Sequence, residues 1–108
     1  MSFELIPTPS FEKELKRLAK KYPSIKNDIA TLAKKLLLNP ASGKSIGNNC
    51  YKIRMAITAK GTGKSAGARV ITYLKIVQEK VFLLSIYDKS EQETISEKEL
   101  DNILKRLM

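Results

Sequence analysis

The sequence predicts an α+β domain whose elements follow the order strand, two helices, three strands, helix (β-α-α-β-β-β-α). Two patterns carry this prediction. Apolar residues recur every three to four positions near the N-terminus and again at the C-terminus, which is the period of an amphipathic helix. Between these regions, alternating and continuous apolar runs rich in β-branched residues are typical of strands. The length of 108 residues suits one compact domain, so we expect a single domain over residues 1–108.

The N-terminal third predicts a short strand followed by a helical hairpin. Residues 3–6 form the expected first strand. Thr8 suits a helix N-cap, and Pro9 suits the first helical position, where a missing N–H costs nothing. Apolar residues spaced four, three and four apart mark one helix over 11–22 and a second over 25–36. The short break between them predicts that the two helices pack as a hairpin.

The rest of the chain predicts three strands and a last helix. Residues 51–58 alternate between apolar and polar side chains, which is typical of a half-buried strand. The runs 70–77 and 81–87 are rich in β-branched and aromatic residues and mostly apolar on both faces, so we expect a hairpin of central strands covered on both faces. Ser96 and Glu99 form a capping box before the last helix. The apolar face of that helix consists of Leu100, Ile103, Leu104 and Leu107.

The composition excludes several classes of protein. The chain has no histidine, which rules out histidine triads and histidine general bases. Cys50 has no second cysteine to pair with, and a Cys/His zinc site is improbable, so we expect neither a metal nor a cofactor. No apolar run reaches the length of a membrane span and the start is not a secretory signal. We therefore expect a cytoplasmic protein without a membrane partner.

The net charge of +9 comes from one stretch of the chain. No acidic residue lies between Asp28 and Glu79, whereas bases and acids balance elsewhere. The nine bases of this stretch are Lys34, Lys35, Lys44, Lys52, Arg54, Lys60, Lys64, Arg69 and Lys75. Such a concentration of positive charge points to a polyanion as partner.

Residues 58–65 (TAKGTGKS) resemble a phosphate-binding P-loop but lack its pattern. Thr58 stands where the motif requires glycine, and the segment leads toward a strand instead of a helix N-terminus. We interpret it as a flexible loop between strands. Lys60 and Lys64 in the loop, and Lys44 earlier in the basic stretch, are candidate RNA-binding residues that contact a phosphate backbone.

A second basic group lies on the predicted sheet. Lys52 and Arg54 project from one face of a strand, about 6.5–7 Å apart. Arg69 opens the next strand and is expected beside them, while Tyr87 ends the last strand and Lys89 follows it. With no carboxylate expected nearby, this face predicts a phosphate-binding surface.

Three segments of this region resemble the core of RelE/HigB-type toxins, which belong to the RelE/ParE superfamily of bacterial toxin–antitoxin modules. They are residues 50–54 (CYKIR), 67–73 (GARVITY) and 84–89 (LSIYDK). The resemblance implies a small antiparallel sheet with a helical hairpin on one side. It also implies an endoribonuclease that cleaves mRNA on the ribosome and so inhibits translation. The implied catalytic residues are Lys52, Arg54, Arg69 and Lys89.

The sequence departs from the family at one place. Well-studied members carry a tyrosine shortly after the last basic residue, and Ile95 stands there in this chain. Tyr87, at the end of the strand, is the candidate substitute.

The resemblance also implies partners. They are the ribosome with its mRNA, a cognate antitoxin, and DNA only indirectly through that antitoxin. We expect the antitoxin to be acidic, partly disordered when free, and to fold over the basic face. It is further expected to displace or clasp the helix at 96–107.

The sequence also allows two other functions. One is a ParE-like inhibitor that poisons DNA gyrase by binding, and the other is a non-catalytic nucleic-acid-binding domain. The bases at Lys52, Arg54 and Arg69 favour the endonuclease, because a gyrase inhibitor has no need of a phosphate-binding sheet face. The missing tyrosine favours the non-catalytic alternative.

Overall fold

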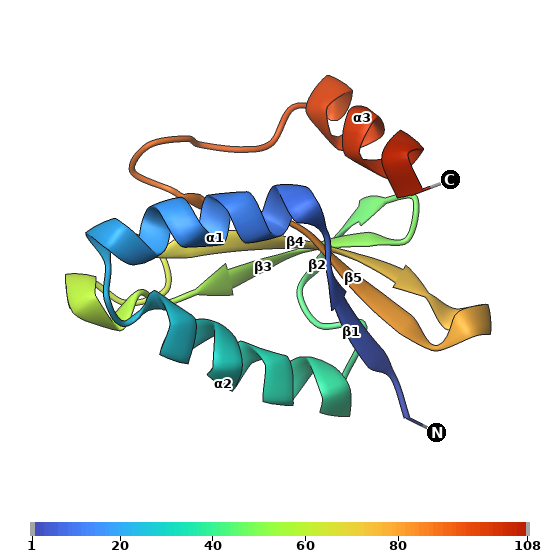
Figure 1. Cartoon of the computed structure of the whole chain (residues 1–108), viewed down its shortest axis with the longest axis horizontal. Coiled ribbons are helices and arrows are strands. Elements are labelled where there is room, and N and C mark those ends of the chain that lie inside the picture. Colours follow the sequence, from blue (N-terminus) through green and yellow to red (C-terminus); the bar gives the residue numbers. More distant parts are fainter. Residues whose placement is uncertain (1, 108) are drawn as a thin grey trace.

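The computed structural model describes residues 2–107 (Figure 1). The strands are β1 (Glu4–Pro7), β2 (Lys44–Gly47), β3 (Cys50–Met55), β4 (Ala68–Lys75) and β5 (Lys80–Asp88). The α-helices are α1 (Pro9–Lys21), α2 (Ile25–Leu38) and α3 (Glu97–Leu107), and two single 3₁₀ turns are η1 (Thr58–Lys60) and η2 (Ile76–Gln78). None of the helices within the described residues is long and apolar enough to cross a membrane.

The strands form one sheet in the order β1-β5-β4-β3-β2. The predicted α+β class and the order of its elements are confirmed, and the apolar strands β4 and β5 are central as expected. The structure adds two details to the predicted antiparallel sheet. β1 pairs with β5 in parallel, and the short strand β2 pairs with β3 at the far edge.

β2 exists because of the turn that joins it to β3. Asn48 and Asn49 both have positive φ angles, 54° and 60°. This is the backbone of a two-residue turn whose twist matches that of a β-hairpin, and asparagine tolerates it better than most residues. The turn folds Gly47 back onto Cys50 and pairs Lys44 with Lys52.

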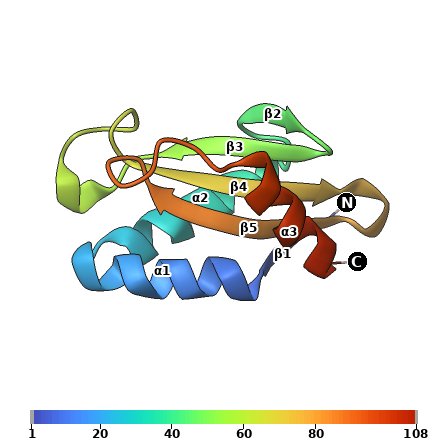
Figure 2. The ribbon, with the colours of Figure 1, turned by 90° about the horizontal axis from the view of Figure 1, so that it is seen from above.

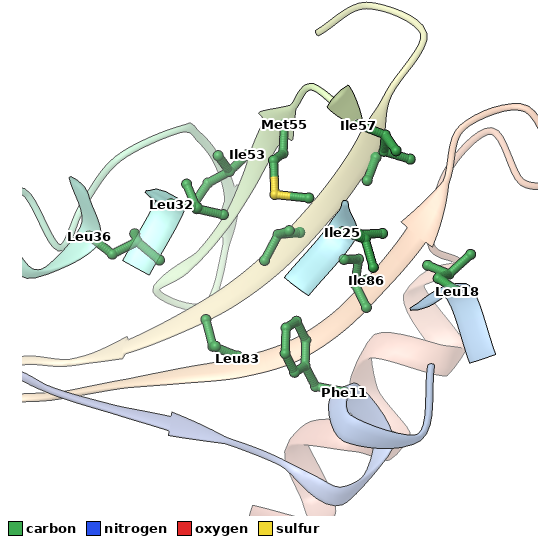
Figure 3. Packing of buried hydrophobic residues seen from close by; sticks show 12 residues of the cluster. Phe11, Leu18, Ile25, Leu32, Leu36, Ile53, Met55, Ile57, Leu83 and Ile86 are labelled. Carbon is green, nitrogen blue, oxygen red and sulfur yellow. The ribbon is translucent and has the colours of Figure 1, made fainter. Parts of the chain in front are cut away.

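Helices cover both faces of the sheet (Figure 2). α3 lies on one face, α2 lies on the other, and α1 runs beside β5. The first core, between the helical hairpin and the sheet, is shown in Figure 3. Its buried residues are Phe11, Leu18, Ile25, Leu32, Leu36, Ile53, Met55, Ile57, Ala68, Val70, Leu83 and Ile86.

Thr8 fixes the start of α1 against the sheet. Its hydroxyl accepts a hydrogen bond from the backbone N–H of Phe11 and donates one of 2.8 Å to the carbonyl of Leu83 in β5. Pro9 occupies the first turn of the helix, so the predicted cap is confirmed. A buried threonine therefore ties β1, α1 and β5 together at one point.

The second core lies between α3 and the opposite face of the sheet. It consists of Cys50, Ile71, Leu84, Tyr87, Ile95, Leu100 and Ile103. Ser96 caps α3 as predicted, because its hydroxyl accepts the N–H of Glu99 at 3.1 Å. Burial raises the pKa of the Cys50 thiol to about 11, so this thiol stays protonated and inert at neutral pH.

Two predicted strands end earlier than expected. The strand predicted over 70–77 ends at Lys75, because Ile76–Gln78 form η2 and Glu79 closes the turn in the left-handed region, with φ at 54°. Val77 is consequently 96% exposed at the tip of the hairpin. The strand predicted over 51–58 ends at Met55, three residues before η1 begins at Thr58.

Candidate nucleic-acid interface

Three functional candidates form a row across the sheet. Arg54 of β3 pairs with Arg69 of β4, and Arg69 pairs with Tyr87 of β5. Residues directly opposite one another in neighbouring strands project from the same face, so two guanidinium groups and a phenol share one side of the sheet. Lys52 lies two residues before Arg54 in β3, opposite Ile71 of β4. Lys44 of β2 pairs with Lys52 from the other side. Lys52, Arg54, Arg69 and Tyr87 thus share one sheet face, as the sequence predicted, and Lys44 joins them although it was not predicted there.

Arg69 is the buried cation of the row, with only 4% of its surface exposed. Its Nη1 donates to the carbonyls of Lys64 and Ala68, both at 3.0 Å, and its Nη2 donates to that of Ser65 at 3.0 Å. A buried guanidinium needs such acceptors, since it has five donors and has left water. In this conformation Arg69 therefore holds the loop at 61–67, and its charge lies beneath that loop.

Tyr87 is also buried, at 3% exposure. Its hydroxyl faces Thr94 and Ile95, yet it forms no hydrogen bond of acceptable geometry with any residue within 2–107. Burial raises the pKa of Tyr87, and the nearby charge of Arg69 opposes that shift only in part. The phenol is consequently protonated at neutral pH and has a proton without a partner.

The N-terminal turn of α3 brings carboxylates to the basic face. Lys52 lines a pocket of about 180 Å³ together with Ile95 and Glu97. The charge of Glu99 acts on Tyr87. The expectation that no carboxylate lies near the basic face is therefore wrong, because the sequence showed where α3 starts but not which face it covers.

Asp88 is a functional candidate that sequence reasoning missed. It is fully buried at the end of β5, and it accepts hydrogen bonds from the hydroxyl of Tyr22 (2.6 Å) and the ammonium of Lys60 (2.9 Å). The backbone N–H and the hydroxyl of Ser90 also donate to it, at 2.9 and 2.7 Å. Burial alone would raise the pKa of Asp88, but these donors outweigh it and hold that pKa well below its usual range. In the sequence, the one sign of this buried role is that an aspartate ends a mostly apolar strand.

The remaining predicted residues occupy three different settings. Lys60 is committed to Asp88, with 15% of its side chain exposed. Lys89 is exposed beyond β5, and its backbone N–H donates to Gly67 at 3.0 Å. Lys64 and Arg54 are exposed and line a common pocket at the edge of β3. The structure thus brings Lys64, but not Lys60, to a surface open to a ligand.

No metal site accompanies this interface in the described part of the chain. Residues 2–107 contain no group of three or more His, Cys, Asp or Glu side chains arranged to hold a metal ion. The site offers guanidinium, ammonium and phenol groups, which bind phosphate oxygens and donate protons.

The family of this chain follows from a match along nearly its whole length. A family model described as the RelE toxin of the RelE / RelB toxin–antitoxin system matches residues 11–107. The protein is thus the toxin component of a toxin–antitoxin system. The chain belongs to the RelE toxin family, as the three sequence segments indicated.

Solved structures of RelE share this fold at low sequence identity. A double mutant of E. coli toxin RelE in the free state is 20% identical, with both chains covered completely and a TM-score of 0.66. The isolated E. coli RelE toxin is 21% identical over the full length of both chains, with a TM-score of 0.61. The intact E. coli RelBE toxin–antitoxin complex gives 21% identity and a TM-score of 0.61, covering 82% of this chain and 96% of that one.

Proposed function

We propose that this protein is an endoribonuclease that cleaves mRNA on the ribosome, inhibits translation and is neutralised by a cognate antitoxin. The observation that carries the proposal is the row of Arg54, Arg69 and Tyr87 across three strands, with Lys52 beside it. Membership of the RelE toxin family supports the same activity. The row supplies cations and a proton donor for a phosphodiester without histidine or metal ligands.

The chemistry is attack of a ribose 2′-hydroxyl on the adjacent phosphorus, which releases the hydroxyl proton to water, forms a 2′,3′-cyclic phosphate and expels the 5′-oxygen. Negative charge grows on the phosphate oxygens as the new bond forms. Guanidinium groups stabilise such charge because their fork matches two phosphate oxygens at once. Arg54 and Arg69 are therefore assigned to the phosphate, and Lys52 adds a compact positive charge from the same face.

Tyr87 is assigned to protonate the leaving 5′-oxygen. Its phenol is protonated at neutral pH and its proton is unused in the free protein. Ile95, at the place of the family's tyrosine, packs in the same core cluster as Tyr87. A phenol from the end of β5 thus reaches the region that the family's tyrosine would occupy, which supports the substitution that the sequence suggested.

Access to the row requires movement of two segments. The loop at 61–67 lies on Arg69, and the segment before α3 lies over Tyr87. A phosphate can reach both side chains only after these segments shift, so free RNA is expected to be a poor substrate. The ribosome can hold the mRNA with its reacting groups in line. Such positioning contributes as much as ~7–11 kcal/mol to a reaction.

The antitoxin is proposed to bind the face of the sheet that α3 covers. E. coli RelE is solved in an intact complex named for toxin and antitoxin. In this chain the basic row lies on the face that α3 covers, and the helix packs through an apolar stripe on Leu100 and Ile103. An acidic antitoxin that folds over this face neutralises the bases and displaces or clasps α3.

RNA binding without cleavage is the second candidate, and one observation favours it. Three donor hydrogens of Arg69 already serve backbone carbonyls, which is the pattern of a structural arginine. In that case Arg54, Lys52 and Lys64 bind phosphate and no group is poised for chemistry.

Primer extension on an mRNA in a purified translation reaction tests the proposal. Arg54→Ala is the best variant, since Arg54 is exposed and its loss leaves the fold intact; Lys20→Ala, exposed on α1, is the matched control. We expect new mRNA ends with wild type and the control, about 100-fold fewer with Arg54→Ala, and none without ribosomes. Folded wild-type protein that produces no ends would contradict the nuclease, and inhibition of DNA supercoiling by that protein would establish the gyrase alternative.

A further inference from the structure

A pocket of about 240 Å³ opens at the free edge of β3, beside Arg54 at the end of the catalytic row, which consists of Arg54, Arg69 and Tyr87. β2 pairs with β3 only as far as Lys52, so the edge from Ile53 onward has no neighbouring strand. α2, η1 and the loop at 61–67 surround this edge. The lining residues that matter for binding are Lys35, Arg54, Lys64, Asp28, Thr31 and Thr58.

Three cations of the pocket are free to bind an anion. Lys35, Arg54 and Lys64 are exposed, and none of them takes part in a salt bridge within residues 2–107. The carboxylate of Asp28 is turned to other partners. It accepts the N–H and the hydroxyl of Thr58, at 3.0 and 2.6 Å, and the hydroxyl of Ser24 at 3.0 Å. The pocket is therefore net positive, and its one acid is satisfied by neutral donors.

Hydrogen bonds hold both walls of the pocket in place. Asp28 and Ser24 fix η1 against α2, the latter through a bond of 2.9 Å from the N–H of Ala59. Arg69 fixes the backbone on the other side, because it binds the carbonyls of Lys64 and Ser65. This gives the buried arginine a role that the catalytic assignment does not explain, namely placing the Lys64 segment beside Arg54. Fixed walls reduce the ordering cost of binding.

We infer that this pocket binds a backbone phosphate of RNA outside the scissile step. The inference deepens the proposed function and rests on RNA as the ligand. Arg54 belongs to both the catalytic row and the pocket, so an RNA strand that contacts exposed Arg54 continues over the edge of β3 into the pocket while the loop at 61–67 stays bound to Arg69. The phosphate comes either from the mRNA being cleaved or from ribosomal RNA, and it is recognised by the same chemistry in both cases.

Charge reversal on α2 tests the inference with a closely matched control. Lys35→Glu changes a pocket residue, whereas Lys34→Glu changes its exposed neighbour, which does not line the pocket. The first probe is a fluorescent 12-nucleotide single-stranded RNA with 2′-O-methyl groups, which cannot be cleaved. We expect Lys35→Glu to weaken binding about 3- to 10-fold more than Lys34→Glu and to reduce the salt slope by about 0.7. Lys64→Glu should reproduce the loss from the other wall.

A second arm identifies the source of the phosphate. Sedimentation with ribosomes lacking mRNA measures contacts with ribosomal RNA, and the fluorescent RNA measures contacts with a single strand. A loss specific to Lys35→Glu in either arm supports the pocket and names the source. Equal behaviour of the two variants in both arms would overturn it, as would wild-type protein that binds neither probe.

The outcomes for the pocket and for the nuclease are separable. Neither binding measurement needs cleavage, so a loss with Lys35→Glu supports the pocket even in a protein that cuts no mRNA. Conversely, normal cleavage with identical binding by both variants removes the pocket and leaves the nuclease in place. Thermal melting of each variant confirms that the compared proteins are folded.

Discussion

Asp88 is the residue on which the loops around the interface depend. It joins Tyr22 from the helical hairpin, Lys60 from η1 and Ser90 from the segment that leads to α3. A buried carboxylate is costly unless every lone pair is used, and here four donors use them. One side chain thereby fixes the position of three segments that are far apart in the sequence.

We expect Asp88→Asn to lower the free energy of unfolding by about 2–3 kcal/mol, because it leaves the Lys60 ammonium largely buried without a counter-charge. Urea unfolding measures this. Asp101→Asn, an exposed change on α3, is the control and should stay within about 0.5 kcal/mol of wild type. A loss no larger than that of the control would show that Asp88 does not hold the junction.

The same residue predicts a dependence of stability on pH. The pKa of Asp88 is lower in the folded protein than in the unfolded chain, where it is about 4. The stabilisation is therefore fully present above about pH 4 and is lost as the pH falls toward the folded pKa. Unfolding measured from pH 7 to pH 2 should show wild type and Asp88→Asn converging below pH 4. Parallel curves down to pH 2 would contradict the lowered pKa.

Gly67 allows the chain to pass close to β3. A Cβ at this position would overlap the carbonyl oxygen of Met55 and lie 3.0 Å from the Cα of Ala56, and neither backbone atom can move freely. We expect Gly67→Ala to destabilise the protein by about 2–3 kcal/mol. Gly63→Ala has open space but a φ of 78°, so its cost should be near 1 kcal/mol. Equal urea midpoints for the two variants would show that the close approach has no energetic weight.

At the scale of elements, α3 is the part most readily exchanged for a partner. It contacts the sheet through one apolar stripe, whereas α1 and α2 close a core of twelve buried residues with it. We expect hydrogen exchange of residues 97–107 to be faster than that of α1 in the free protein, and to change on addition of the cognate antitoxin. Unchanged exchange in α3, with the antitoxin bound elsewhere, would remove the helix from the antitoxin interface.

The elements that the sequence predicted well are those with a local signal. Thr8 and Ser96 mark helix starts because their hydroxyls accept backbone N–H groups of the first turn. The apolar runs of β4 and β5 identify central strands. β2 was missed because it is short and polar, with a glycine at its end, although the Asn48-Asn49 turn was a usable sign. The parallel partner of β1 has no local signal, since it depends on how the helical hairpin returns the chain to the sheet.

Strand pairing places Lys52, Arg54, Arg69 and Tyr87 on one face, as predicted, whereas the burial of Arg69 and Tyr87 was not predicted. Alternation along β3 was enough to place Lys52 and Arg54 together. The covering of Arg69 by its own loop, and the capture of Lys60 by Asp88, arise from contacts that no periodicity encodes. The role of Lys35 in the edge pocket was equally hidden, because α2 reaches β3 only in the folded molecule.

At the scale of the whole molecule, the residues that stabilise the fold and the residues that carry the excess positive charge lie in different places. Two apolar cores stabilise the sheet from both faces, while the bases of the acid-free stretch are distributed over α2, β2, β3, η1, the 61–67 loop and β4. This arrangement leaves a basic edge that borders the row of Arg54, Arg69 and Tyr87. We propose that this row performs chemistry instead of only binding phosphate.

The most direct test of that claim is the single-turnover cleavage rate of Tyr87→Phe on ribosomes programmed with mRNA. The substitution removes one buried hydroxyl that has no hydrogen-bond partner within residues 2–107, so the stability should be unchanged or slightly higher. If Tyr87 donates the proton to the leaving oxygen, the rate falls about 100-fold or more while ribosome binding stays at the wild-type level. Cleavage by Tyr87→Phe at the wild-type rate would contradict the account and remove the phenol from the reaction.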